Sequence, residues 1–91
     1  MILPKRLMFD IKFTPQGQKD LKNLPKDIQR RVIKKIKYFS GQPNPIVFSK
    51  PLVNIPPSTH RFRVGKYRIA FYVSSRTICI DRIRHRKGVY Y

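Results

Sequence analysis

The sequence contains no glutamate, no tryptophan and only one cysteine, and these absences exclude several classes of protein. Cys79 has no partner for a disulfide within the chain, and its apolar neighbours predict a buried, unreactive thiol. No segment approaches the roughly 20 apolar residues that span a membrane. The apolar run before Asp10 is too short for the core of a secretory signal peptide, so we expect a cytoplasmic protein.

Metal ligands are equally scarce. The acidic residues, the two histidines and the cysteine form no group at the spacing of a magnesium or zinc site. The acids are Asp10, Asp20, Asp27 and Asp81. The chain also lacks a glycine-rich phosphate loop. We therefore expect no metal and no cofactor, and any catalysis has to use cations, histidines and tyrosines.

Positive charge dominates what remains. Lysine and arginine number 21 against four acids, which gives a formal net charge of +17 in 91 residues. Self-repulsion of this size lowers stability, and a polyanionic partner is the usual reason to tolerate it. Nucleic acid fits better than a membrane surface, because the basic residues are spread along the chain rather than along one amphipathic helix.

The length allows one domain, which we place at residues 8–91. It follows an extension at residues 1–7 that has no hydrophobic period, and we expect this extension to be disordered and dispensable. Phe9, Ile11 and Phe13 alternate with polar residues, which predicts an N-terminal strand with one face on a core.

A pair of helices is predicted after this strand. Thr14 and the proline after it are a typical helix start, so a first helix is expected to run to about residue 23. Pro25 breaks the chain, and a second helix is expected over residues 26–40. Its apolar stripe consists of Ile28, Val32, Ile36 and Phe39.

Strands dominate the second half of the chain. Residues 42–58 contain five of the eight prolines and predict a loop, with at most a short edge segment near residues 46–48. A period of two then predicts three strands, with the first tight turn at residues 65–66. Ile80 and Ile83 fall on opposite parities, so we expect either a bulge in the last strand or a strand covered on both faces. The fold class is thus α+β, an antiparallel β-sheet with an N-terminal strand, a two-helix hairpin packed on one face and a C-terminal three-stranded meander.

RNA offers a reaction that suits a protein without metal ligands. Its 2′-OH can attack the neighbouring phosphate if a base accepts the hydroxyl proton and an acid protonates the leaving oxygen. Cations must also stabilise the extra charge on the phosphate. DNA has no 2′-OH, so the scarcity of metal ligands favours RNA.

The first predicted hairpin carries the strongest candidates for that chemistry. Alternation directs Phe62 and Val64 to the core. Arg61 and Arg63 then lie side by side on the other face, and Arg68 joins them from the next strand. Three guanidiniums in this arrangement would clamp a phosphate. A solvated strand face is the alternative interpretation.

The basic tail, residues 82–91, is the second place where such residues gather. A disordered basic extension is one interpretation. The aromatic end of the tail favours docking instead, and Tyr90 is suited to stacking on a base. His85 in the tail and His60 before the hairpin are each either a bystander or a proton carrier.

In this order and at this length, the segments resemble the RelE/ParE toxin superfamily, the toxin halves of type II toxin–antitoxin pairs. The resemblance covers residues 8–91 and rests on the N-terminal strand, the helix hairpin with residues 21–25, the hairpin at residues 61–69 and the ending at residues 83–90. RelE-like members are metal-independent endoribonucleases that cleave messenger RNA in the ribosomal A site through 2′-OH attack. The resemblance implies the same activity here.

The resemblance also implies roles for individual residues. Tyr90 would be the base or a stacking group and Arg86 the acid, and His85 would be a substitute for either. The implied phosphate clamp is Arg61, Arg63 and Arg68. The implied partners are messenger RNA, the ribosome and a cognate antitoxin whose acidic or amphipathic segment crosses the arginine face; no membrane and no small-molecule cofactor is expected.

Two alternatives stay open at the level of the sequence. A ParE-like member has the same fold but inhibits DNA gyrase without being an enzyme. A small basic ribosomal or RNA-binding protein would also account for the size and the charge.

Overall fold

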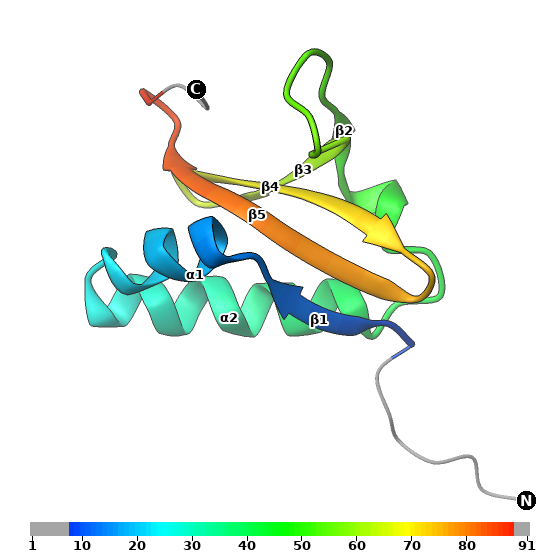
Figure 1. Ribbon diagram of the computed structural model, residues 1–91. Helices are drawn as coiled ribbons and strands as arrows, with labels where there is room; N and C mark the ends of the chain where they lie inside the picture. Colours follow the sequence, from blue (N-terminus) through cyan, green and yellow to red (C-terminus); the bar gives the residue numbers. More distant parts are fainter. Residues whose placement is uncertain (1–7, 89–91) are drawn as a thin grey trace, which may run out of the picture.

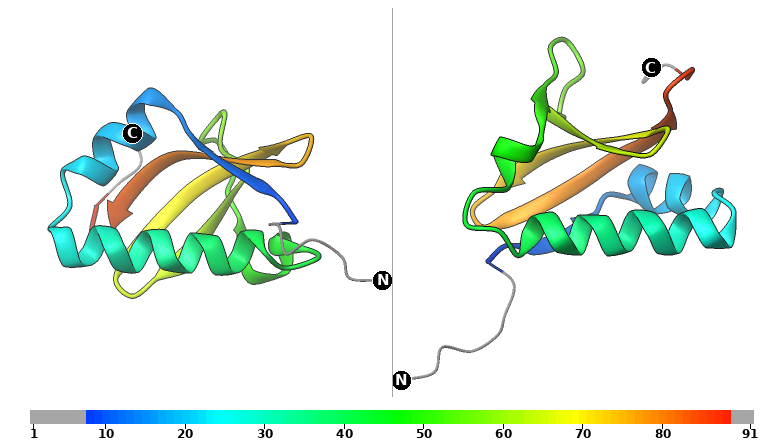
Figure 2. Two further views of the ribbon diagram at one scale, coloured as in Figure 1. Left: turned by 90° about the horizontal axis from the view of Figure 1, so that it is seen from below. Right: turned by 180° about the vertical axis from the view of Figure 1, so that it is seen from behind.

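The computed structural model describes residues 8–88 as two layers, a five-stranded sheet with two helices on one of its faces (Figure 1). The helices are α1 (Pro15–Lys22) and α2 (Lys26–Ser40), and a short 3-10 helix, η1 (Pro45–Phe48), precedes the second strand. The strands are β1 (Asp10–Phe13), β2 (Lys50–Pro51), β3 (His60–Val64), β4 (Tyr67–Ser74) and β5 (Thr77–His85). The views from below and behind place both helices under the same face (Figure 2). We call the other side of the sheet the open face.

The sheet has the strand order β1-β5-β4-β3-β2. The meander β3–β4–β5 is antiparallel, and the α+β class is confirmed. The prediction of a wholly antiparallel sheet needs one correction, because β1 pairs with β5 in the parallel direction and the sheet is mixed. Alternation in a sequence shows which face a side chain takes, but it carries no information on the direction of the neighbouring strand.

The helix hairpin forms as its sequence predicts. The Thr14 hydroxyl accepts the backbone N–H of Gly17 at 3.0 Å and so caps α1. In α2 the stripe residues are buried, except that Ile28 is half-buried. Phe39 of this stripe stacks on Phe62 with ring centroids 4.3 Å apart. These contacts fix α2 across the strands of the meander.

The bulge expected in the last strand is present. Ala70 of β4 pairs with Arg82 and Phe71 with Ile80, so Asp81 has no partner on β4. The extra residue shifts the alternation of β5, and both Ile80 and Ile83 are therefore buried under the helices.

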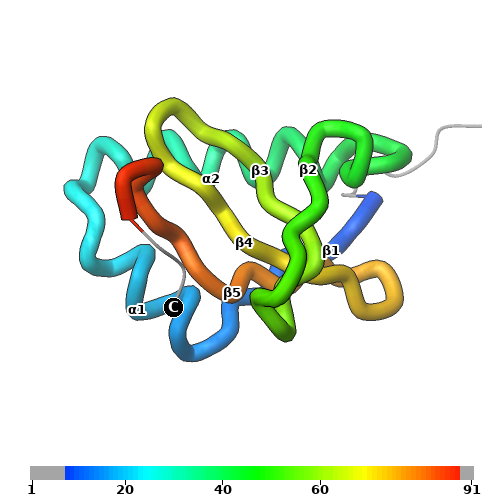
Figure 3. The backbone as a smooth tube through the Cα atoms, turned by 90° about the horizontal axis from the view of Figure 1, so that it is seen from above, coloured from blue at the N-terminus to red at the C-terminus, as the bar shows by residue number. Residues whose placement is uncertain are grey.

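The proline-rich loop differs from the expected edge segment. Residues 46–48 form part of η1, because Asn44 accepts the N–H of Ile46 at 3.3 Å and Pro45 has the fixed φ of a first helical position. The edge strand is the two-residue β2, which pairs with β3. After β2 the chain crosses the open face, and Ser58 Oγ donates to Asp81 Oδ2 of β5 at 3.4 Å. Figure 3 shows this green segment from above, lying over the sheet.

The close packing of α1 on β5 leads to a prediction about Gly17. A Cβ at this position would lie 2.2 Å from the backbone oxygen of Ile80, so an alanine forces the helix away from the strand. We expect Gly17→Ala to lower the free energy of unfolding by about 1–3 kcal/mol, although alanine favours a helix. Urea denaturation followed by circular dichroism measures the loss. Gln18→Ala, at an exposed position of the same helix, is the control, and equal stability of the two variants would contradict the close approach.

Candidate nucleic-acid interface

Arginine side chains form a row across the open face. Arg63 of β3 is the register partner of Arg68 on β4, which is in turn the partner of Arg84 on β5. Directly opposed like charges destabilise a sheet, because their Cβ atoms are only about 5 Å apart. An anionic ligand over the row would reverse this cost.

A second row lies one step along the strands. Arg61 of β3 and Arg82 of β5 flank Ala70 of β4, and Lys50 of β2 pairs with Arg61 on its outer side. Ala70 is fully buried although its side chain points to the open face, where the loop that carries Ser58 crosses. The rows thus bring Arg61, Arg63 and Arg68 together on the open face, and we call these three residues the clamp.

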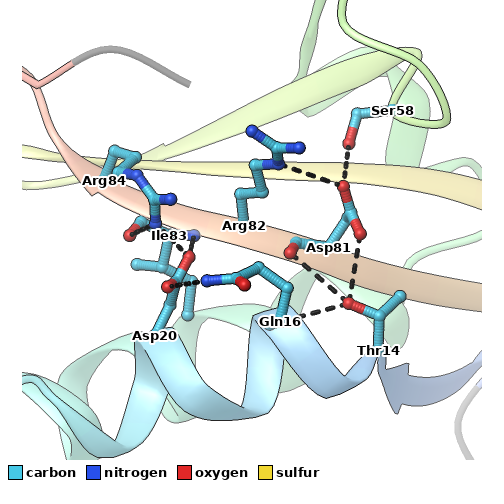
Figure 4. A network of polar contacts seen from close by, with 9 residues as sticks. Thr14, Gln16, Asp20, Ser58, Asp81, Arg82, Ile83 and Arg84 are labelled. Carbon is cyan, nitrogen blue, oxygen red and sulfur yellow. Dashed lines mark hydrogen bonds and ion pairs between the residues drawn. The ribbon is translucent and has the colours of Figure 1, made fainter. Parts of the chain in front are cut away.

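Two buried carboxylates neutralise the arginines of β5 (Figure 4). Asp20 of α1 forms an ion pair with Arg84, and Asp81 of the bulge lies 3.5 Å from Arg82 Nε, close enough for an ion pair but without hydrogen-bond geometry. Residues 8–88 form no ion pairs other than these two. Within this part of the chain the clamp therefore has no acidic partner.

The two carboxylates also hold the backbone in place. Asp20 Oδ2 accepts the N–H of Ile83 at 2.9 Å, and Asp20 Oδ1 accepts from Gln16 at 2.8 Å. Asp81 Oδ1 accepts from the Thr14 hydroxyl at 3.1 Å. Each acid therefore joins α1 or its N-cap to β5, and the fold uses the charge that would otherwise oppose an anion.

One clamp residue has a hydrogen-bond donor without a partner in the described part of the chain. Arg68 is half-buried, and its Nε is buried without a hydrogen-bond partner in the described part of the chain. A buried donor without a partner costs about 1–3 kcal/mol. A phosphate oxygen at this point would remove the cost, which makes Arg68 the centre of the clamp.

Two hollows open beside the second row and farther along β4. The first, of about 130 Å³, is lined by Phe48, Lys50, Arg61 and Arg63. The second, of about 230 Å³, contains Tyr72, Cys79 and Lys12, which are register neighbours across β4, β5 and β1. Cys79 is buried, as its apolar neighbours predicted. The adjacent Cys79 and Asp81 raise the pKa of Tyr72, so its phenol stays neutral at neutral pH and is a poor base.

Arg86 follows the end of β5 and is exposed. Its backbone N–H donates to the carbonyl of Lys66 at 2.6 Å, which extends the β4–β5 ladder by one residue. Arg86 therefore lies in the turn that follows β5, two residues after Arg84. Tyr90, the other residue with an implied proton-transfer role, lies outside the described residues.

The histidines lie on the helix side of the sheet. His85 pairs with Tyr67, whose ring it meets edge-on with centroids 5.3 Å apart, and its Nδ1 accepts the N–H of Lys87 at 3.2 Å. His60 is half-buried beside Phe71. The structure therefore separates His85 from the clamp by the thickness of the sheet.

The sequence analysis assigned no individual role to several interface residues. Arg82 and Arg84 alternate with Ile83, and this pattern alone would have placed them beside the clamp. Lys50 and Phe48 gave no such signal, because they lie in the proline-rich segment without a period. Over residues 8–88, no three histidine, cysteine or acidic side chains gather as a metal site, and no helix has the length and apolar character to cross a membrane.

Comparison with known families now identifies the chain. The profile of the family described as "ParE toxin of type II toxin-antitoxin system, parDE" matches residues 11–90. The chain belongs to the RelE/ParE toxin superfamily. It is the toxin of a type II toxin–antitoxin system. A comparison with curated proteins finds no match.

Three solved structures are similar over almost the whole chain. The RelBE2 toxin–antitoxin complex of Mycobacterium tuberculosis has a TM-score of 0.76 and 28% identity, covering 92% of this chain and 98% of that one. The archaeal RelE–RelB complex of Pyrococcus horikoshii has a TM-score of 0.69 and 25% identity, covering 91% and 100%. The RelB–RelE complex of Methanococcus jannaschii has a TM-score of 0.65 and 32% identity, covering 87% and 94%. All three contain a toxin bound to its antitoxin.

Proposed function

We propose that this toxin is a metal-independent endoribonuclease that cleaves messenger RNA in the ribosomal A site. The observation that carries the proposal is the clamp, three arginines on one face without an acidic partner among residues 8–88. The buried Nε of Arg68 adds a donor that an anion would satisfy. This is the arrangement that a phosphate with growing negative charge requires.

In the proposed reaction one phosphorus–oxygen bond forms, another breaks, and two protons are transferred. The 2′-oxygen attacks the adjacent phosphorus, its proton passes to the phenolate form of Tyr90, and the bond from phosphorus to the 5′-oxygen breaks. Arg86 gives a proton to the departing 5′-oxygen. A guanidinium stays protonated at neutral pH, so it releases a proton only to a base as strong as an alkoxide. The products are a 2′,3′-cyclic phosphate and a 5′-hydroxyl. The clamp stabilises the extra negative charge that the phosphate carries during the reaction.

The partners follow from the same face. The proposed substrate is presented by the ribosome, which places the toxin in the cytoplasm. The cognate antitoxin would lay an acidic or amphipathic segment over the clamp and compete with RNA. The similar solved structures support the antitoxin, since each of them is a toxin–antitoxin complex.

Cleavage of ribosome-bound message tests the proposal. Toxin purified in the presence of EDTA and then dialysed is added to translating ribosomes, and the message ends are mapped by primer extension. We expect cuts within the A-site codon that leave a 2′,3′-cyclic phosphate, at the same sites for EDTA-treated and untreated toxin. Intact message at toxin concentrations that stop growth would contradict the proposal.

A second candidate function has one observation in its favour. The matching family profile is described by its ParE toxin, which points to inhibition of DNA gyrase by the same fold. A supercoiling assay with purified gyrase separates the two functions. We expect no inhibition at toxin concentrations that cleave message, and inhibition without cleavage would favour the ParE-like function.

A further inference from the structure

Phe48 occupies an unusual position at the edge of the arginine face. It is 41% exposed and ends η1, just before β2. Its ring packs against Phe39 with centroids 5.5 Å apart and meets Tyr38 edge-on at 6.0 Å. The ring is therefore held from the core side, while its remaining surface lines the hollow of about 130 Å³.

The other walls of this hollow are cationic. Lys50, Arg61 and Arg63 line it together with Phe48, and Lys50 is the register partner of Arg61. None of the three is in an ion pair with an acid of residues 8–88. A fixed aromatic plane beside three cations is the combination by which proteins bind single-stranded nucleic acid, the base on the ring and the phosphate on the charges.

We propose that this hollow is a nucleotide subsite, in which Phe48 stacks on a base and Lys50 binds its phosphate together with Arg61 and Arg63. The subsite rests on the proposed function in one respect, that the nucleotide belongs to the RNA being cut. Phenylalanine has no polar group to read a base, so the subsite accepts any base and favours the purines, which stack over a larger area.

The position of the hollow decides which nucleotide it takes. Strands in a sheet are about 5 Å apart and residues along a strand about 3.3 Å, so the hollow at Arg61 and Arg86, which lies two strands across and four residues beyond Arg82, are roughly 16 Å apart. A base on Phe48 therefore belongs to a nucleotide at a distance from the cleaved phosphodiester and is not part of it. Phe48 and Lys50 position the RNA. The proposed proton transfers take place at Arg86, beyond the end of β5.

The absence of tryptophan allows a direct test. Phe48→Trp makes position 48 the sole tryptophan of the chain, and its fluorescence reports contact with a base. The probe is the tetranucleotide of deoxyadenosine, which has no 2′-OH and cannot be cut by the proposed reaction. We expect saturable quenching that weakens as salt is raised, because phosphate binding releases counterions. Val47→Trp is the matched control, since Val47 is 69% exposed in the same helix and does not line the hollow.

Affinity measurements complete the test. Phe48→Leu keeps apolar bulk against Phe39 and should weaken binding of the tetranucleotide about 5- to 100-fold. Lys50→Ala, at an exposed position, should weaken it several-fold and reduce its salt dependence by about one charge. Val47→Ala should bind as the original chain does, and circular dichroism verifies that each variant is folded.

Three outcomes would overturn the subsite: no quenching in the Phe48→Trp variant, equal quenching in the Val47→Trp control, or quenching by an antitoxin peptide and not by the tetranucleotide. The last would make the hollow a protein-docking site. The measurement involves no cleavage and no ribosome. A chain that binds the tetranucleotide through Phe48 and leaves ribosome-bound message intact would therefore disprove the ribonuclease proposal alone.

Discussion

Replacing Arg86 by alanine should slow cleavage of ribosome-bound message about 100-fold or more, the usual effect of removing an acid–base group. The side chain is exposed and follows the end of β5, so the free energy of unfolding should change by only about 0.5 kcal/mol. Affinity for RNA should fall far less than the rate, because the clamp still holds the phosphate. Single-turnover cleavage at saturating toxin separates the rate from the affinity.

Lys87→Ala is the matched control for this experiment, since Lys87 is the exposed cation next to Arg86. Its removal should weaken binding slightly and leave the rate at saturation unchanged. Arg61→Ala and Arg63→Ala remove clamp charges and should reduce both affinity and rate, with a smaller dependence on salt. If Arg86→Ala and Lys87→Ala lose affinity equally and keep the full rate, Arg86 is a phosphate contact and not a proton donor.

Local sequence patterns were sufficient for most of the fold. The cap at Thr14, the break at Pro25 and the stripe on α2 gave both helices nearly at their observed bounds. The change of parity between Ile80 and Ile83 gave the bulge. These features depend on residues within a few positions of each other, and the physical rules that link sequence to local structure apply over that range.

Features that depend on distant residues were not predictable. Nothing near β1 indicates that it pairs in parallel with β5. Alternation places the clamp arginines on one face but shows neither the loop that crosses beside them nor the hollow at Phe48. The sequence left His85 as either a bystander or a proton carrier, and only the register with Tyr67 places it on the helix side.

The four acids illustrate the same limit. In the sequence they are scattered and without a pattern. In the structure Asp20 of α1 and Asp81 of β5 are buried and paired with Arg84 and Arg82, whereas Asp10 and Asp27 are exposed. The positive field of the open face is therefore not an average over the surface, because the acids nearest to it are already occupied in holding the fold together.

The largest effect on stability is expected from Asp20→Ala. Asp20 is only 8% exposed, and its carboxylate accepts the N–H of Ile83, accepts from Gln16 and pairs with Arg84, whose side chain is 28% exposed. Alanine leaves the buried N–H of Ile83 without an acceptor, and it leaves the half-buried Arg84 guanidinium without a charged partner, with only the carbonyl of Ile83 at 3.2 Å to accept from it. We expect the free energy of unfolding to fall by about 2–4 kcal/mol, a large part of the roughly 5–15 kcal/mol of a small domain. Urea denaturation followed by circular dichroism measures the loss.

A mutant cycle shows how much of that loss belongs to the ion pair. Asp20→Ala combined with Arg84→Ala should destabilise the chain by less than the sum of the single changes, because the second substitution removes the charge that the first left unpaired. Asp20→Asn should lose less than Asp20→Ala, since an amide oxygen still accepts the N–H of Ile83. Asp10→Ala, at an exposed position, should change stability by about 0.5 kcal/mol or less. Strict additivity in the cycle would mean that Asp20 acts through the backbone of β5 alone, and that Arg84 is as available to an anion as the three residues of the clamp.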